Sequence, residues 1–280
     1  MGTLRKWISH GLAASLAVFI VACDDEGGVG AGIGPEAGAC YDSNSRDYTE
    51  NGPYGYDIER VAGYEVYVPR ATADCNQFPV VGFAMGTGTP PSNYRAYYRH
   101  MASWGMVVVI DPANLINLGG SSLEDAIQDV QRDRTLGSSL TEVGLIGHSQ
   151  GGAAVVNVAL GNDLDVTAIV GLMPALFTGG GRIDAAGLYI GGTTDLFGAA
   201  TDPQRPYDNT SGPAFIADMQ GQGHMVGSGR GSEASILAMS TAWFRCHLGK
   251  DSNACGLFER SSVRSCAFSG RWAKCGGKNL

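Results

Sequence analysis

The sequence is poor in charged residues, and basic residues are the scarcer kind. Only 16% of its 280 residues are charged, with 19 Lys and Arg against 27 Asp and Glu, and the formal net charge is -8. Because such a chain offers few cations to phosphate groups, we expect no nucleic-acid partner. Hydrophobic residues make up 44%, which is typical of a globular protein. The length suits one large α/β domain better than two small ones.

The apolar run nearest the N-terminus is too short for a membrane-spanning helix. It extends from Gly11 to Ala22, follows Arg5 and Lys6, and stops directly before Cys23. A positive start and a short apolar run are typical of a secretion signal, and the letters IVAC at its end resemble a bacterial lipobox. We therefore interpret residues 1–22 as a lipoprotein signal peptide and Cys23 as the lipidated residue. An ordinary signal peptide with a nearby cysteine is the alternative.

This interpretation predicts an exported bacterial lipoprotein, at the periplasmic face or the cell surface. Lipid on the cysteine would be its only contact with the membrane. Residues 23–45 are rich in glycine and are predicted to be a flexible tether. Residues 46–280 then form the folded domain, which we expect to be monomeric.

Seven cysteines remain to be explained, and none of them has the CxxC spacing of a metal site. If Cys23 carries lipid, six are left, an even number in an exported chain. Six cysteines allow 15 pairings. We predict three short-range disulfides and no metal: Cys40–Cys75, Cys246–Cys255 and Cys266–Cys275.

Apolar runs alternate with helical patterns through the domain. Such alternation predicts an α/β fold with a mostly parallel, doubly wound sheet flanked by helices, and no insertion is long enough for a lid domain. Ser121 and Glu124 are predicted to form a capping box at one helix start. The predicted strands are Tyr64–Val68, Phe78–Ala84, Met106–Ile110, Glu142–Gly147, Thr167–Leu172, Gly187–Ile190 and Ala214–Ala217. The predicted helices cover Tyr94–Trp104, a segment around Leu123–Val130, Gly152–Leu160, and a last one through Ile236 and Cys246.

The letters GHSQGG at 147–152 match the G-x-S-x-G pattern of a nucleophilic serine. The pattern alone is weak in a glycine-rich chain, but here it follows an apolar strand and opens a helix of small residues. A nucleophile elbow requires that context. We therefore predict Ser149 as the nucleophile. The alternative is a Gly-rich turn with a solvated serine.

A serine hydroxyl needs a base, and the base needs an acid that orients it. In such folds the acid and then the histidine follow the serine along the chain. His224 lies in a loop after the last apolar strand and is the predicted base, whereas His247 falls within the last helix. Asp195 follows the preceding strand and is the predicted acid.

Two other aspartates are weaker candidates for the acid. Asp202 lies further along the same loop, and Asp184 precedes the strand. His148 is adjacent to the nucleophile and is predicted to line the substrate cleft. His100 is predicted to be structural.

An oxyanion hole requires two backbone N–H donors. One is predicted to be the N–H of Gln150, directly after the nucleophile. The other should come from the loop Met85–Thr89, where we choose the N–H of Thr87. The HGGG motif of lipases is absent from this loop.

With these features the chain resembles the bacterial cutinase, polyester hydrolase and dienelactone-hydrolase-like branch of the α/β-hydrolases, over roughly residues 52–249. The resemblance implies an α/β-hydrolase fold with an open cleft and carboxylic ester hydrolysis through an acyl-enzyme, without cofactor. Thr87 stands where polyester hydrolases commonly have an aromatic residue, and Gln150 stands where they often have Met. The stretch 173–177 replaces their cleft tryptophan, so Met173 and Phe177 are predicted to line the cleft.

Two alternatives stay open from the sequence. The same triad would serve a thioesterase, a peptidase or an acyltransferase. A hydrolase fold without activity could also be a binding lipoprotein, and a large distance between Ser149 and its predicted partners would favour that function.

Overall fold

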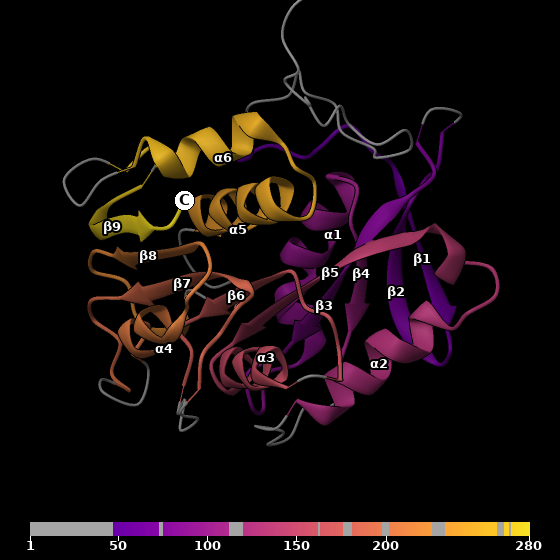
Figure 1. Cartoon of the computed structure of the whole chain (residues 1–280), viewed down its shortest axis with the longest axis horizontal. Coiled ribbons are helices and arrows are strands. Elements are labelled where there is room, and N and C mark those ends of the chain that lie inside the picture. Colours follow the sequence, from indigo (N-terminus) through magenta and orange to yellow (C-terminus); the bar gives the residue numbers. More distant parts are fainter. Residues whose placement is uncertain are drawn as a thin grey trace, which may run out of the picture. The chain divides into compact units, whose positions relative to one another are not determined.

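A nine-stranded, mostly parallel β-sheet forms the centre of the protein (Figure 1). The computed structural model describes residues 47–72, 75–111, 120–161, 163–175, 181–197, 202–225, 233–261, 266–268 and 270–280. The strands are ordered β1-β2-β4-β3-β5-β6-β7-β8-β9 across the sheet. Their bounds are β1 Tyr56–Val61, β2 Tyr64–Pro69, β3 Phe78–Ala84, β4 Val107–Ile110, β5 Leu140–His148, β6 Ala168–Leu172, β7 Ala186–Gly192, β8 Ala214–Met219 and β9 Trp272–Lys278.

The six strands from β4 to β8 in this order are parallel to one another. The antiparallel pairs lie at the two sides of the sheet, where β1 pairs with β2, β2 with β4, and β9 with β8. The parallel strands therefore end at one common edge, which is where open α/β sheets bind ligands.

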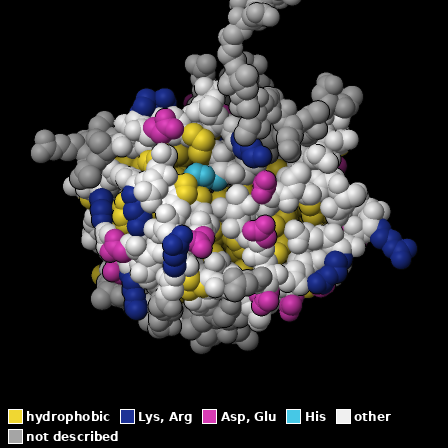
Figure 2. Space-filling model, viewed as in Figure 1, with side chains coloured by type: hydrophobic (Ala, Val, Ile, Leu, Met, Phe, Trp, Pro, Cys, Tyr) yellow, Lys and Arg dark blue, Asp and Glu magenta, His cyan; other side chains and the backbone are white. Residues whose placement is uncertain are grey.

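Helices cover both faces of the sheet (Figure 1). On one face, α1, α5 and α6 pack over one core cluster, and on the other α2, α3 and α4 pack over a second. Their bounds are α1 Arg95–Ser103, α2 Ser121–Gln131, α3 Gln150–Leu160, α4 Gln204–Asn209, α5 Glu233–His247 and α6 Ser252–Glu259. The predicted α/β architecture, with a mostly parallel sheet flanked by helices, is confirmed. On the face of the molecule drawn in Figure 2, acidic and basic side chains are interspersed among uncharged ones.

The continuous apolar runs explain the central strands. All residues of β3, β4 and β6 are buried, as expected for parallel strands covered on both faces. The seven predicted strands and four predicted helices are all present, with ends displaced by a few residues.

The sequence did not reveal the two edge strands. In β1 the four central residues are exposed, and they include Asp57, Glu59 and Arg60, so no apolar alternation marks this strand. In β9 the interior contains Lys274 and two glycines, and pairing with β8 imposes the strand conformation on them. Tertiary contacts override propensity in both strands.

The predicted capping box at α2 is wrong. Gly120 is the N-cap residue with a φ of 77°, and no side chain caps this helix start. Ser122, one position after the expected cap, donates instead to the Asp111 carboxylate at 2.7 Å.

Two of the predicted disulfides, Cys246–Cys255 and Cys266–Cys275, are present. Cys75 is also disulfide-bonded. The predicted partner Cys40 and the predicted lipidation site Cys23 lie outside the described residues, so both remain predictions. Within the described ranges, no helix is long and apolar enough to cross a membrane.

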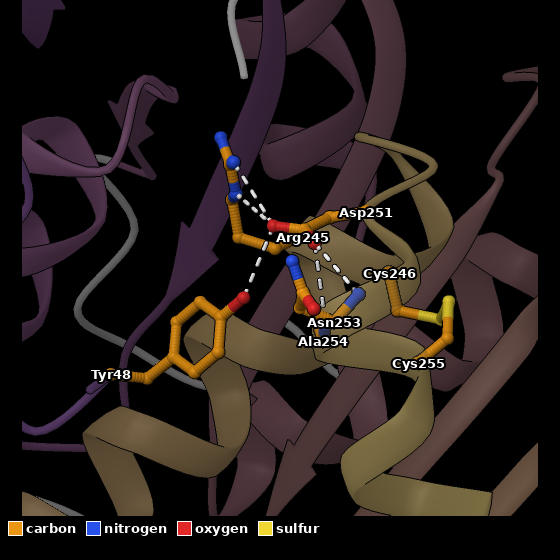
Figure 3. The surroundings of a disulfide bond; sticks show 7 residues. All are labelled: Tyr48, Arg245, Cys246, Asp251, Asn253, Ala254 and Cys255. Carbon is orange, nitrogen blue, oxygen red and sulfur yellow. Dashed lines mark hydrogen bonds and ion pairs between the residues drawn. A yellow bond between two sulfur atoms is a disulfide. The ribbon is translucent and has the colours of Figure 1, made fainter. Parts of the chain in front are cut away.

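A buried ion pair joins the C-terminal helices beside the Cys246–Cys255 disulfide (Figure 3). The Arg245 guanidinium lies 3.1 Å from the Asp251 carboxylate, and their side chains are 2% and 4% exposed. The Tyr48 hydroxyl donates to the same carboxylate oxygen at 3.1 Å. The other oxygen accepts from the N–H groups of Asn253 and Ala254 and thereby caps α6. One carboxylate thus connects the segment before β1, helix α5 and helix α6.

We expect Asp251→Ala to lower the free energy of unfolding by about 3–5 kcal/mol, because it leaves the Arg245 charge buried without its partner. Tyr48→Phe removes only one hydrogen bond from the same carboxylate and is expected to cost about 1 kcal/mol. Urea denaturation with the disulfides intact measures both. Equal effects of the two substitutions would contradict a dominant ion pair.

Candidate active site

Ser149 occupies a strained turn between β5 and α3. Its φ is 56° and its ψ is -121°, a left-handed conformation that costs a residue with a side chain free energy. The turn is possible because the residues two positions before and two positions after Ser149 lack a Cβ. A Cβ on Gly147 would lie 2.1 Å from the Gly151 carbonyl oxygen, and one on Gly151 would lie 2.2 Å from that of Ala84. The local sequence therefore permits the tight strand-to-helix turn that a nucleophile elbow requires.

The predicted base and acid lie beside this serine. His224 Nε2 is 2.9 Å from Ser149 Oγ, and His224 Nδ1 is 2.9 Å from Asp195 Oδ2. A carboxylate can only accept, so Nδ1 carries a proton and Nε2 is free to accept the serine proton. The second oxygen of Asp195 accepts from the Phe197 N–H at 2.9 Å, which fixes the carboxylate. The three predicted residues form one hydrogen-bonded series, and the imidazole and carboxylate are 9% and 6% exposed.

The loops that carry the acid and the base are bonded to each other. The Thr194 N–H donates to the Gln222 carbonyl at 3.0 Å, and the Gly221 N–H donates to the Thr193 hydroxyl at 2.8 Å. A Cβ on Gly192 would lie 2.4 Å from the Gln222 carbonyl oxygen, so this approach requires glycine. These contacts fix the positions of Asp195 and His224 relative to each other.

The alternative residues lie in other environments. Asp184 forms an exposed ion pair with Arg182, and the Asp202 side chain accepts from the Gln204 N–H at 2.9 Å at the start of α4. His247 is in α5, with its ring 4.1 Å from that of Trp243.

His100, which was predicted to have a structural role, lies in α1. Its Nε2 lies 3.0 Å from the Tyr48 carbonyl oxygen, a buried contact that fits the predicted structural role.

The residues of both predicted oxyanion donors lie in the cleft that contains the serine. The Thr87 hydroxyl is hydrogen-bonded to the Gln150 side-chain oxygen, so the two residues are adjacent. A Cβ on Gly86 would lie 3.3 Å from Ser149 Cβ, which places the loop backbone directly against the nucleophile. The Gln150 N–H opens α3, where helix N–H groups lack intrahelical partners. The backbones of both predicted donor residues therefore lie close to Ser149.

The serine opens into a cleft of about 350 Å³. His148 is among its lining residues, as predicted, and Ala175 and the two predicted oxyanion residues, Thr87 and Gln150, line it as well. The prediction for Met173 is wrong. Met173 is fully buried in the core, because a φ of 44° turns the chain at the end of β6, and it is not part of the cleft lining. Phe177 lies outside the described residues.

Two exposed apolar residues of the cleft were not predicted from the sequence. Phe197 and Met225 line the cleft and are 60% and 40% exposed. Phe197 lies two positions after the acid, with its ring 4.5 Å from the His224 ring, and Met225 follows His224 directly. Their positions in the sequence, next to the predicted acid and base, could have indicated that they line the cleft. They give the cleft an apolar margin.

We expect the free energy of unfolding to fall in mild acid because three histidines have lowered pKa values. Burial lowers the pKa of His100, His148 and His247 from 6.5 to about 4. Between these values the unfolded chain binds protons that the folded one does not, so stability falls as pH falls from 6.5 towards 4. Each histidine contributes at most about 1.4 kcal/mol per pH unit.

Urea denaturation at pH steps from 7.5 to 4.5 tests this prediction, and the expected result is a steady fall in the free energy of unfolding below pH 6.5. His247→Leu removes one of the three groups and should make the fall shallower. An unfolding free energy that stays constant between pH 6.5 and 4.5 would show that these rings are protonated in the folded state.

Comparison with known proteins gives no further guide. No protein-family model matches the chain, and no curated protein sequence matches it.

Proposed function

We propose that this protein is a serine hydrolase of the α/β-hydrolase type that cleaves carboxylic esters. The hydrogen-bonded series Ser149–His224–Asp195 is the observation that carries the proposal. The strand order, with the serine after β5, the acid after β7 and the histidine after β8, supports the α/β-hydrolase fold.

The reaction proceeds in two acyl transfers. His224 Nε2 takes the Ser149 proton while Oγ forms a bond to the ester carbonyl carbon, and the N–H groups of Thr87 and Gln150 receive the oxyanion. Asp195 stabilises the imidazolium that forms. The imidazolium then protonates the leaving alcohol as the ester bond breaks. Water, deprotonated by His224, releases the acid from the acyl-enzyme and restores the serine.

The cleft supports an ester with an apolar substituent. The side chains of Phe197 and Met225 stand at its margin beside His224, where the acyl or alcohol group of a bound ester would lie. Thioester, peptide and acyl-transfer chemistry use the same three residues and are the competing reactions. A large distance between Ser149 and its predicted partners would have favoured an inactive binding protein, but the two distances in the triad are 2.9 Å.

The Cys246–Cys255 and Cys266–Cys275 disulfides support a protein that acts in an oxidising compartment. The proposal therefore keeps the export that the N-terminal sequence predicts, with a lipid anchor on Cys23. Palmitate labelling of cells expressing the wild-type chain or Cys23→Ser tests the anchor independently of activity.

The first experiment combines turnover with covalent labelling. The purified protein is assayed with p-nitrophenyl esters of increasing acyl length, and is treated with a fluorophosphonate before peptide mass spectrometry. We expect hydrolysis and an adduct on Ser149. An adduct without ester hydrolysis would favour the competing acyl transfers, and a folded protein that gives neither would refute the proposal.

A further inference from the structure

His148 uses both of its ring nitrogens in hydrogen bonds at the floor of the candidate site. It is the last residue of β5, directly before Ser149, and it is 1% exposed. Nε2 lies 2.9 Å from the backbone carbonyl oxygen of His224, and Nδ1 lies 2.8 Å from the Tyr94 hydroxyl. That hydroxyl also accepts from the Gly86 N–H at 3.0 Å.

The direction of each bond follows from the chemistry of its partners. A carbonyl oxygen only accepts, so His148 Nε2 carries the proton and Nδ1 has the lone pair. Tyr94 therefore donates its single proton to Nδ1, and its oxygen is left to accept from the backbone. Burial keeps this ring neutral, because it lowers the pKa of His148 to about 4. The result is one directed series from the Gly86 N–H through Tyr94 and His148 to the His224 carbonyl.

The two ends of this series lie in the two loops that ester hydrolysis must align. Gly86 precedes Thr87, the predicted oxyanion donor, and His224 is the predicted base. A Cβ on Gly86 would lie 2.8 Å from His148 Nδ1 and 3.1 Å from the Tyr94 hydroxyl oxygen, so the loop backbone rests against the series.

We propose that His148 is a positioning residue that, together with Tyr94, fixes the loop of the base relative to the loop of the oxyanion donor. The inference rests on the proposed function. His148 takes no proton from Ser149, since its Nε2 points at the His224 backbone. It acts by holding the imidazole of His224 and the Thr87 N–H in their places, and a displacement of about 1 Å between such groups can lower a rate about 100-fold.

Two substitutions interrupt the series at different points. Tyr94→Phe removes one hydroxyl and leaves the packing of the ring, and His148→Leu removes both bonds of the imidazole. We expect each to lower kcat about 10- to 100-fold while KM changes less than about threefold, because alignment is needed in the transition state rather than for binding.

Tyr98→Phe is the matched control. Tyr94 precedes α1 directly, and Tyr98 lies in the first turn of α1; Tyr98 is fully buried, and its hydroxyl has no hydrogen-bond partner among the described residues. This substitution also removes a buried hydroxyl, but outside the series, and is expected to leave kcat unchanged. If Tyr98→Phe lowered kcat as much as Tyr94→Phe, general loosening of the core would explain the loss.

The double variant separates a series from two independent effects. If Tyr94 and His148 act through one another, Tyr94→Phe combined with His148→Leu should lose no more than the worse single variant. Losses in kcat that multiply would overturn the proposal, as would full kcat in Tyr94→Phe. His148→Met, which also lacks both hydrogen-bonding ring nitrogens, replaces His148→Leu in the cycle if the leucine variant fails to fold.

NMR of protein labelled with ¹⁵N-histidine tests the arrangement without any substrate. We expect His148 as the Nε2–H tautomer, and a low-field resonance from the His224 proton bonded to Asp195 that shifts in Tyr94→Phe but not in Tyr98→Phe. A wild type inactive on esters but with these signals would refute the proposed reaction and keep the series. The Nδ1–H tautomer for His148 would refute the series even in an active esterase.

Discussion

Ser149→Ala is expected to lower kcat for the best p-nitrophenyl ester by about six orders of magnitude. The substitution removes the oxygen that must bond to the carbonyl carbon, and nothing near it can replace that atom. Stability should be unchanged or slightly altered, because the site keeps its glycine-bounded turn and only a partly exposed hydroxyl is lost. Stopped and continuous assays at equal protein concentration measure the ratio, and thermal melting compares the folds.

Ser92→Ala provides the control, since Ser92 is an exposed serine in the short helix before α1. It should retain wild-type kcat. Ester hydrolysis that persists in Ser149→Ala at more than about a hundredth of the wild-type rate would place the nucleophile elsewhere.

Asp195→Asn is expected to lower kcat by about four orders of magnitude. The Asn amide can present an N–H to His224 Nδ1, which would then accept and leave the proton on Nε2. In that tautomer the imidazole cannot take the Ser149 proton. The size of the substituent hardly changes, so a change in packing does not account for the expected loss.

Asp202→Asn is the matched control for the acid, because Asp202 is the other loop aspartate that the sequence offered and its side chain accepts from the Gln204 N–H at the start of α4. It should keep full activity. The variant that combines Asp195→Asn with Ser149→Ala should be no slower than Ser149→Ala alone, since both residues serve one proton transfer. A further loss in that variant would show that Asp195 has a second role.

The central strands and the turn at Ser149 could be predicted from sequence because residues close together in the chain determine them. The β-branched runs mark buried strands, and the glycines at 147, 151 and 152 mark a turn in which only small neighbours fit around Ser149. Chain order then assigned His224 and Asp195 through a rule about the fold, not through any local signal of their own.

Other parts depend on contacts between distant residues and could not be read from the chain. Met173 lies where a cleft residue was expected, but its backbone conformation directs the side chain into the core. Tyr94 and His148 are hydrogen-bonded but lie more than fifty positions apart in the sequence. No pattern in the sequence links Tyr94 or Gly86 to His148. Ser121 is a residue type that commonly caps helices, but Gly120, which precedes it, is the N-cap residue and has a left-handed backbone conformation.

The two edge strands decide how the protein behaves when it is crowded. An unpaired strand edge offers N–H and carbonyl groups to any neighbouring chain, and flat apolar edges lead to polymerisation through added strands. Here β1 exposes Glu59 and Arg60, and β9 carries Lys274 and Lys278. Another chain that docked on either side would have to accommodate these charges. We therefore expect the charged residues of β1 and β9 to oppose aggregation through the edges of the sheet.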